Sequence, residues 1–371
     1  MHLDYAIAGG GLSGTLLALA IRARQPAARI ALIERGPRLG GNHLWSFHAA
    51  DVPEEARALV EPLVVRRWPA YQVAFPDGAR TLSLPYASIS AERLDAVGRA
   101  ALGEAVLTSS AVVRISASEV ELADGRVLAA RRVIDARGPL GLQTSGALAF
   151  QKFAGVELRV ARAPELPTLM DAKVEQRDGF RFLYVLPLAE DRVLVEDTRF
   201  SISPTLDVAQ VEADALAYAS EHGLSGELVR REHGVLPLPL DVLPAPEGIL
   251  RAGYGGAFFH PTTGYSFPAA LRLALHVASR PPEQAMDADF HQLVADLRVQ
   301  QRFCLWLNRL LYRAVPEAER WRVLARFHQL PEDTIARFYA LQMTGQDRAR
   351  IVCGRPPRGV SLRAAFRELR A

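Results

Sequence analysis

The chain has 371 residues, of which 49% are hydrophobic and 23% are charged, and its formal net charge is +3 at pH 7. This length suits roughly two or three domains with a sizeable core, and the hydrophobic content is ordinary for a globular protein. The only two cysteines, Cys304 and Cys353, form no CxxC motif, so the composition implies neither a disulfide framework nor a thiolate metal site and fits a reducing compartment.

The first 35 residues predict a strand, a glycine turn, a helix and a second strand that ends in an acid. The segment Tyr5-Ala-Ile-Ala-Gly-Gly-Gly-Leu-Ser-Gly14 leads into an apolar helical stretch and then into Arg29–Glu34. Gly9 permits a tight turn, Gly11 lets the backbone approach a pyrophosphate, and Gly14 lets helix and strand pack closely. The start of the helix adds unpaired N–H groups and the positive end of its dipole. Glu34 follows Gly14 by 20 residues, the spacing of an acid that binds the adenosine ribose.

These features predict a dinucleotide site near the N-terminus. The glycines suit NAD as well as FAD, but a motif that begins almost at residue one, followed by Gly40-Gly41 after Glu34-Arg35, favours FAD. We expect neither a signal peptide nor a membrane span in this segment, since Asp4 and the glycines occupy it. The cofactor residues predicted here are Gly9, Gly10, Gly11, Leu12, Ser13, Gly14, Glu34, Arg35 and Gly41.

Further along, the pattern continues as alternating strands and helices. Two strands joined at Pro76-Asp77-Gly78 are expected over Tyr71–Leu84, and a helix over Ala91–Leu102. Strands follow at Val106–Ile115 and Val120–Val127. An apolar strand then ends in Asp135-Ala-Arg137-Gly138, which places Asp135, Arg137 and Gly138 at the expected cofactor edge.

Residues 150–200 change character. A hairpin is predicted from Phe180–Pro187 and Arg192–Thr198, and a helix over Asp207–His222. The chain returns to the cofactor domain near Gly248–Gly253 and is almost wholly helical beyond Asp287.

We therefore predict an α/β fold with a discontinuous Rossmann-type FAD-binding domain (1–68, 86–150 and 245–286). An inserted mixed β-sheet substrate domain (69–85 and 151–244) and a helical C-terminal region (287–371) complete it. Hydroxylase-like flavoproteins have this organisation and hold their substrate between the inserted sheet and the flavin.

Several segments together resemble one family, the bacterial flavin-dependent lycopene β-cyclases. The resemblance extends from the N-terminus to about Gly354. It is carried by Gly40–His48, Val133–Gly138, Met170-Asp171, Phe180–Pro187, Val195–Thr198, Phe259–Ser266, Leu307–Leu311 and Leu330–Tyr339.

The resemblance implies an isomerase of carotenoid biosynthesis that closes β-ionone rings at the ends of lycopene and gives β-carotene via γ-carotene. It also implies reduced FAD, with NADPH as the electron donor, although the reaction has no net redox change. Such chemistry needs a protonated carboxylic acid, a dry apolar slot for a polyene and an electron-rich group that stabilises a cation.

Glu196 is our candidate for the acid, since burial on an apolar strand raises a carboxyl pKa. Asp197 points to the opposite face of that strand. The resemblance makes Glu196 face the pocket, with Leu194 and Thr198 beside it. Asp171 is a second candidate, either as a partner carboxyl group or as a structural hydrogen-bond acceptor.

The matched segments also supply candidate substrate and cofactor residues. Trp45, Phe47, Tyr184, Phe259 and His260 are expected to line the polyene slot, with ordinary core packing as the alternative for the aromatic side chains. No metal site is expected from the histidines, which lack helical i,i+4 spacing. Because Gly253-Tyr254-Gly255-Gly256 lacks the flavin-binding Asp of many hydroxylases, we expect backbone N–H groups of Thr263, Gly264 and Tyr265 to hold the flavin.

The C-terminal part is strongly basic. From Arg298 to Ala371 the chain holds 15 arginines and 6 acidic residues, so this part carries +9 and the rest −6. Over Arg298–Arg313 the apolar and basic side chains occupy different helix faces, which suits either a membrane surface or packing on the core. We expect peripheral attachment to the cytoplasmic side of the cell membrane and no binding of nucleic acid.

Two other functions remain open at this point. One is a redox flavoprotein, either a polyprenyl reductase or a hydroxylase, which would consume NADPH in proportion to product. The other is a non-catalytic prenyl-binding escort, against which the intact glycine motif and Glu34 argue.

Overall fold

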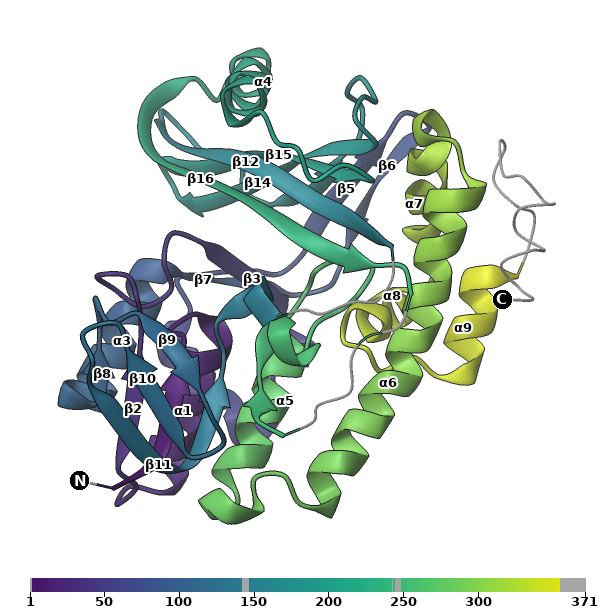
Figure 1. Cartoon of the computed structure of the whole chain (residues 1–371). Coiled ribbons are helices and arrows are strands. Elements are labelled where there is room, and N and C mark those ends of the chain that lie inside the picture. Colours follow the sequence, from purple (N-terminus) through teal and green to yellow (C-terminus); the bar gives the residue numbers. More distant parts are fainter. Residues whose placement is uncertain (1, 142–146, 242, 244–247, 354–371) are drawn as a thin grey trace.

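The computed structural model of the chain describes residues 2–141, 147–241, 243 and 248–353. Two seven-stranded sheets and one three-stranded sheet form its framework, and helices pack around and between them (Figure 1). Residues 245–247 and 354–371, which belong to the predicted cofactor and C-terminal regions, lie outside the described residues.

The first sheet contains the glycine motif and lies at the lower left of Figure 1. Its order is β8-β2-β1-β11-β10-β9, with β17 beside β11. The parallel strands are β1 (Leu3–Ala8), β2 (Ile30–Ile33), β8 (Val106–Leu107), β11 (Val127–Asp135) and β17 (Leu250–Arg251). The antiparallel strands are β9 (Val112–Ile115) and β10 (Glu119–Leu122). The sheet thus rejoins residues 250–251 to the N-terminal segment.

The strand predicted over Val106–Ile115 is interrupted. Ser109 has φ +52°, and its N–H and that of Ser110 donate to the carbonyl groups of Gly36 and Glu34. The chain therefore turns beside the end of β2 before β9 begins.

Three helices pack against this sheet: α1 (Leu12–Arg24), α3 (Ala91–Leu102) and α5 (Phe267–Ala278). The bounds of α3 agree with the prediction, and the Ser90 side chain caps it by accepting from the Arg93 N–H. Helices α1 and α5 lie side by side and share one hydrophobic core.

The second sheet is mixed and lies at the top of Figure 1. Its order is β16-β12-β15-β14-β13-β5-β6. The strands are β5 (Tyr71–Phe75), β6 (Gly78–Leu82), β12 (Leu148–Val160), β13 (Thr168–Asp171), β14 (Phe180–Ala189), β15 (Arg192–Ser201) and β16 (Gly226–Pro239). The early pair β5–β6 joins the later strands through parallel pairing of β5 with β13. The hairpin predicted around residues 188–191 is confirmed as β14–β15.

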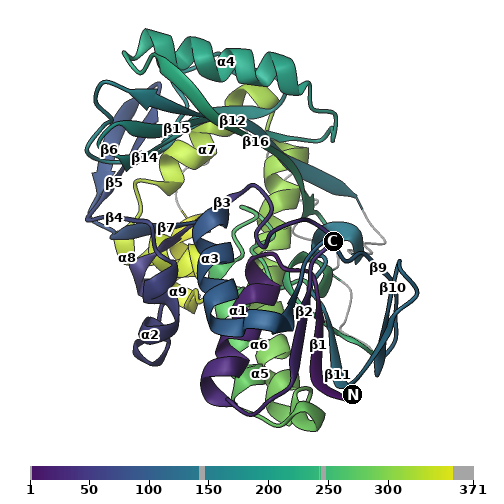
Figure 2. The same ribbon diagram turned by 90° about the vertical axis from the view of Figure 1, so that its left-hand side faces the viewer.

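The two faces of this sheet have different partners. Helix α4 (Val208–Glu221) lies across the outer face (Figure 2) and packs on β12 and β15. Along β15, Val193 and Val195 belong to the core under α4. Leu194 and Phe200 belong to the core on the other face, because successive strand side chains point in opposite directions.

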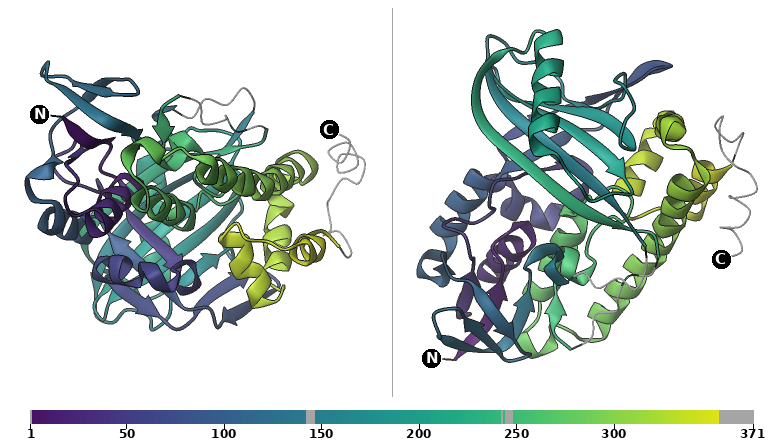
Figure 3. Two further views of the ribbon diagram at one scale, coloured as in Figure 1. Left: turned by 90° about the horizontal axis from the view of Figure 1, so that it is seen from below. Right: turned by 45° about the horizontal axis from the view of Figure 1, so that its top comes forward.

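A small sheet and the C-terminal helices connect the two large sheets. The small sheet has the order β3-β7-β4; its strands are β3 (Leu44–His48), β4 (Arg66–Trp68) and β7 (Tyr86–Ser90), and the short α2 (Arg57–Val60) precedes β4. The long α6 (Ala288–Arg309) runs from beside α5 towards the second sheet (Figure 3). After a π-helical turn at Leu310–Ala314 come α7 (Arg320–Phe327), α8 (Glu332–Tyr339) and α9 (Gly345–Val352). Of the helices in the described ranges, none is long and apolar enough to cross a membrane.

Candidate active site

A cavity of about 1320 Å³ lies where the two large sheets and the C-terminal helices meet. Cavities for a single small ligand commonly measure about 300–1000 Å³, so this one has room for more than one. One part is lined by the glycine motif, a second by the inner face of the second sheet, and a third by α6, α7 and α8.

The glycine motif has the geometry that a pyrophosphate requires. Gly9 has φ +106°, and a Cβ there would lie 2.5 Å from the carbonyl oxygen of Ala136. A Cβ on Gly14 would lie 1.9 Å from the carbonyl oxygen of Gly9, so α1 packs directly on the turn. At Gly11 a Cβ would meet nothing within 4 Å, and this residue lines the cavity. The N-terminus of α1, which no side chain caps, is therefore accessible to an anion.

Glu34 lies at the cavity beside this turn. Its carboxylate accepts from the N–H groups of Gly10, at 2.8 Å, and Gly36, at 2.7 Å. Each oxygen keeps a second lone pair, since a carboxylate has about four acceptor positions. The side chain is thus fixed next to the turn and can still accept from a ribose hydroxyl.

Other predicted cofactor residues divide into lining and supporting positions. Arg137 and Gly138 line the cavity, as do Leu12, Ser13, Arg35 and Gly41. Asp135 forms a two-point ion pair with Arg137, at 2.9 Å for both contacts, but is not among the lining residues. Gly10 and Gly14 also lie behind the cavity surface, so their role is in packing.

A second helix N-terminus reaches the cavity through Thr263, Gly264 and Tyr265, just before α5. No side chain caps α5. A Cβ on Gly264 would lie 2.6 Å from the Gln151 side-chain oxygen. That oxygen is buried, lines the cavity and has no hydrogen-bond partner.

Together these features fit FAD. The open side of Gly11 and the α1 N-terminus suit the pyrophosphate, and Glu34 suits the ribose. The unpartnered Gln151 oxygen suits an N–H donor of a flavin ring. The Tyr265 hydroxyl donates to the buried carboxyl of Asp51, whose pKa burial raises to about 6, so this side chain braces the segment before α5.

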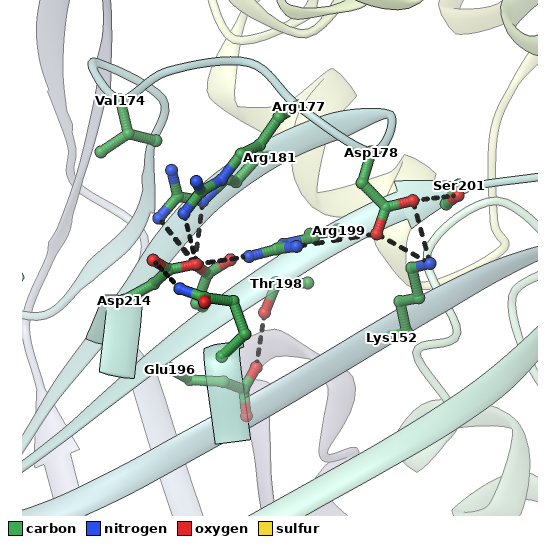
Figure 4. Close-up of polar contacts among 12 residues, drawn as sticks. Lys152, Val174, Arg177, Asp178, Arg181, Glu196, Thr198, Arg199, Ser201 and Asp214 are labelled. Atoms are coloured by element: carbon green, nitrogen blue, oxygen red, sulfur yellow. Dashed lines mark hydrogen bonds and ion pairs between the residues drawn. The ribbon is translucent and has the colours of Figure 1, made fainter. Parts of the chain in front are cut away.

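Glu196 lies on β15 and lines the cavity from the second sheet. It is buried, and its carboxyl oxygen accepts from the Thr198 hydroxyl at 2.7 Å (Figure 4). Burial is the largest cause that raises the pKa of Glu196 well above its ordinary value, and the negative charge of Glu232 is the next. Both causes favour the protonated, uncharged form of this carboxyl group.

Glu232 is a second buried carboxyl group at the cavity. On β16 it stands opposite Gly155 of β12, and Gly155 in turn stands opposite Glu196 of β15. The two carboxyl groups are close enough for each to shift the pKa of the other. Arg230 holds Glu232 from the side, 2.7 Å from its carboxylate.

The next residue, Asp197, lies on the opposite face of β15. It is fully buried and paired with Arg181, at 2.8 Å, and with Arg199. Asp214 of α4 binds the same two arginines, and Lys152 and Asp178 extend the cluster (Figure 4). This ionic cluster joins α4 to the sheet and does not reach the cavity.

The third part of the cavity is apolar. Its lining side chains come from α6, the π-helical turn, α7, α8 and the loop between α7 and α8: Trp306, Leu307, Leu310, Leu311, Val323, Leu324, Phe327, Leu330, Phe338 and Tyr339. The lining continues to Ile351 and Val352 of α9, where Val352 is exposed. Four side chains of the apolar face predicted over Arg298–Arg313 thus line the cavity, namely Trp306, Leu307, Leu310 and Leu311.

Comparison with known proteins places the chain among enzymes of one kind. Residues 4–365 match the model of the lycopene cyclase protein family. The chain belongs to the lycopene cyclase family. It is 39% identical to the lycopene beta-cyclase of Pantoea ananas, over 96% of this chain and 95% of that protein. It is 40% identical to the lycopene beta-cyclase of Pseudescherichia vulneris, over 95% and 94% of the two chains.

Solved structures confirm the predicted fold class of this lycopene cyclase family member. A geranylgeranyl bacteriochlorophyll reductase-like protein from Thermoplasma acidophilum superposes with a TM-score of 0.61 at 14% identity, over 99% of this chain and 96% of that chain. A probable FAD-dependent monooxygenase from Pseudomonas aeruginosa, pqsL, superposes with a TM-score of 0.58 at 18% identity, over 86% and 98%. The fold is that of Rossmann-type flavoproteins.

In this lycopene cyclase fold, Asp171 does not join Glu196. It lies at the end of β13 on the outer side of the sheet, where it accepts from the Tyr218 hydroxyl of α4 at 2.8 Å and from the Lys173 N–H. The adjacent Met170 lines the cavity instead. Of the two roles predicted for Asp171, the structure supports the structural acceptor and contradicts the partner carboxyl group.

Three of the five predicted slot residues are also absent from the cavity surface, although Trp45 and Tyr184 line it. Phe47 stacks on Phe267 at 3.9 Å, and Phe259 stacks on Tyr254 at 4.0 Å. His260 contacts the Phe338 carbonyl oxygen at 3.0 Å, and burial lowers its pKa to about 3. These three side chains build the core behind the cavity.

Sequence reasoning missed Glu232. In the sequence it is one acid in a polar strand, Glu227 to His233, and only the pairing of β12 with both β15 and β16 places it beside Glu196. The residues that the structure describes contain no group of three or more His, Cys, Asp or Glu side chains arranged to hold a metal ion.

Proposed function

We propose that this chain is a lycopene β-cyclase, an isomerase that converts the linear ends of lycopene to β-ionone rings and gives β-carotene via γ-carotene. The relatives at 39–40% identity carry that name. The single observation that carries the proposal is Glu196, a buried carboxyl group with a raised pKa in a cavity whose far end is lined by apolar helices.

In this proposal, Glu196 donates its proton to the terminal double bond of the polyene. The neighbouring double bond attacks the resulting tertiary cation, and loss of a proton beside the new cation completes the ring. No electrons are gained or lost. The surrounding apolar and aromatic side chains, among them Phe182 and Trp45, exclude the water that would otherwise trap the cation.

The cofactor of the proposal is FAD in its reduced form, with NADPH as electron donor. Gly11 and the α1 N-terminus would hold the pyrophosphate, Glu34 the ribose, and the segment before α5 with Gln151 the flavin ring. When bound, reduced flavin supplies an electron-rich ring that can stabilise a nearby cation. The aromatic faces of Trp45 and Tyr184 lie in the same cavity.

We also propose peripheral attachment to the cytoplasmic side of the cell membrane, where a hydrocarbon substrate is dissolved. The support is that the apolar part of the cavity continues to Val352 of α9, which is exposed, and to Arg326. Flotation with liposomes of anionic lipid measures it. A protein that stays at the bottom of the gradient with and without lipid would contradict attachment.

The function itself is tested in cells engineered to accumulate lycopene. Expression of this chain should convert lycopene to β-carotene, as resolved by chromatography of the extracts. With purified protein, cyclisation should need only catalytic amounts of NADPH. Consumption of NADPH in proportion to product would indicate a redox flavoprotein, and a colourless, inactive protein would indicate a prenyl-binding escort.

A further inference from the structure

We propose that Glu232 shares the proton of Glu196, and that Arg230 determines which of the two carboxyl groups carries it. The inference rests on the proposed cyclase function and extends it to a proton-sharing partner and a positioning residue at the same site.

The geometry begins with one row of residues across four strands. Glu232 of β16, Gly155 of β12, Glu196 of β15 and Tyr184 of β14 stand opposite one another in register. Strands β16 and β15 lie on either side of β12 and are therefore about 10 Å apart, twice the spacing of neighbouring strands. A side chain on the middle strand would separate the two glutamates. Gly155 has none, and a Cβ there would lie 3.2 Å from the Glu196 Cβ.

Charge is distributed unequally over the pair. Arg230 contacts Glu232 at 2.7 Å and Glu157 at 2.9 Å, and Arg192 also binds Glu157. The two arginines therefore balance Glu157 and an ionised Glu232. Within the described residues no cationic side chain is recorded in an ion pair with Glu196, so one proton on the pair resides on Glu196.

The electrostatic surroundings agree with this assignment. Burial raises the pKa of both carboxyl groups, and Arg230 opposes that rise only for Glu232. Burial and, after it, the charge of the same arginine lower the pKa of the nearby His43. Other polar and titratable groups also lie around the pair: Tyr184, Tyr86, Thr198, Glu157, His233 and, behind the strand, Asp197. Burial raises the pKa of the Tyr184 and Tyr86 phenols and keeps them neutral.

The pair also accounts for the return of the proton. When the Glu196 O–H bond breaks and a C–H bond forms on the substrate, both carboxyl groups are ionised beside a single contacting arginine. Two adjacent carboxylates in a buried site repel each other, which raises their affinity for a proton. The C–H bond beside the cyclised cation then breaks, and its proton returns to the pair, so charge and atoms balance over one turnover.

The test is a pH titration of purified Glu232→Gln, followed in two ways: by the infrared carbonyl band of protonated carboxylic acids and by the rate of cyclisation. The wild type should show a buried protonated acid that is lost in Glu196→Gln. Removing the neighbouring negative charge should lower the pH at which Glu196 ionises by roughly one unit or more. The infrared band and the alkaline limb of the rate profile should move together.

Two further variants sharpen the comparison. Arg230→Met should add a second protonated acid at neutral pH, because Glu232 loses its cation, and Arg230→Lys should not. Glu227→Gln removes the same charge from the same strand, where Glu227 pairs with Arg159 at the surface, and should shift neither readout.

An unchanged titration in Glu232→Gln, or an equal shift in Glu227→Gln, would overturn the proposal. Should Arg230→Met not fold, the Glu232→Gln titration decides alone. If the wild type cyclises no lycopene at any pH, the proposed function fails, while the infrared titration still reports whether the two carboxyl groups share a proton.

Discussion

Glu196 and Asp197 are adjacent in sequence, both buried, and have opposite electrostatic surroundings. Asp197 binds two arginines under α4. Glu196 faces the cavity, where its neighbours are a hydroxyl group and another carboxyl group. The alternation of a β-strand therefore separates a structural anion from a proton donor, and the two residues should respond differently to loss of the carboxyl group.

Glu196→Gln should abolish most of the activity. Glutamine preserves the shape of the side chain but has no transferable proton, so cyclisation should fall by roughly 100- to 10,000-fold, the usual contribution of a general acid. Pigment conversion in lycopene-accumulating cells measures it, with flavin content as the control for folding. Near-normal conversion would assign the acid to another residue, and Glu232 would be examined next.

Asp197→Asn should instead destabilise the fold. Removing this carboxylate leaves Arg181 and Arg199 with only Asp214 and Asp178 as counter-charges. Breaking a buried ion pair costs about 3–5 kcal/mol. Chemical denaturation of the purified protein measures the change. Asp191→Asn is the matched control, since Asp191 pairs with Arg159 at the surface, and such pairs contribute about 1 kcal/mol or less. Equal effects of the two variants would contradict a structural role for Asp197.

The free energy of unfolding should depend on pH through Glu196. Its pKa is raised in the folded protein, so between its ordinary value and its folded value the folded state binds more protons than the unfolded state. The contribution of this proton to the free energy of unfolding is fully present below the ordinary pKa. It falls as the pH rises towards the folded pKa, by at most about 1.4 kcal/mol per pH unit. Chemical denaturation at a series of pH values gives the free energy of unfolding over this range. That free energy should change less with pH in Glu196→Gln than in the wild type, and the same pH dependence in both proteins would contradict the raised pKa.

Much of this fold was predictable because local signals dominate it. The glycine turn, the Ser90-capped α3 and the hairpin of β14 and β15 depend on residues close in sequence. The strand at Val106–Ile115 was predicted as continuous and is interrupted at Ser109, because Ser109 and Ser110 bind the carbonyl groups of Gly36 and Glu34. Those contacts join distant segments and leave no local pattern.

The site was predictable in part for the same reason. Glu196 was identified from its apolar strand and from the family resemblance, and its inward direction follows from alternation. Asp171 was given an alternative catalytic role because no local pattern shows that β13 turns it towards Tyr218 of α4. Glu232 was missed because its relation to Glu196 exists only across two strand pairings.

Gly155→Ala should impair catalysis with little effect on the cofactor. The new Cβ would lie 3.2 Å from the Glu196 Cβ and 3.3 Å from its Cγ, which forces the acid to move. The contact requires Glu196 to move by a few tenths of an ångström. Because a misplacement of about 1 Å can lower a rate by roughly 100-fold, the expected loss is smaller than that. Pigment conversion and flavin content are the two readouts. The control is Gly345→Ala, where a Cβ meets nothing within 4 Å, and conversion should stay normal there. Wild-type activity in Gly155→Ala would show that Glu196 can shift to accommodate the methyl group without loss of catalysis.

Gly11→Val should remove the cofactor and leave the fold intact. Gly11 has φ −73° and ψ −170°, a backbone conformation open to any residue, and a Cβ there contacts nothing within 4 Å. The backbone therefore accommodates a Cβ here, and the valine methyl groups would extend into the space in which a pyrophosphate meets the α1 N-terminus. Flavin absorbance per protein should fall to background, while thermal unfolding of the flavin-free forms of both proteins stays the same.

The control is Gly345→Val, at an exposed helix start outside the cavity, which should keep its flavin. Retention of flavin by Gly11→Val at wild-type affinity would show that the dinucleotide does not pass over this turn. The role of the α1 N-terminus would then be refuted, and the cofactor would have to enter the cavity by the segment before α5.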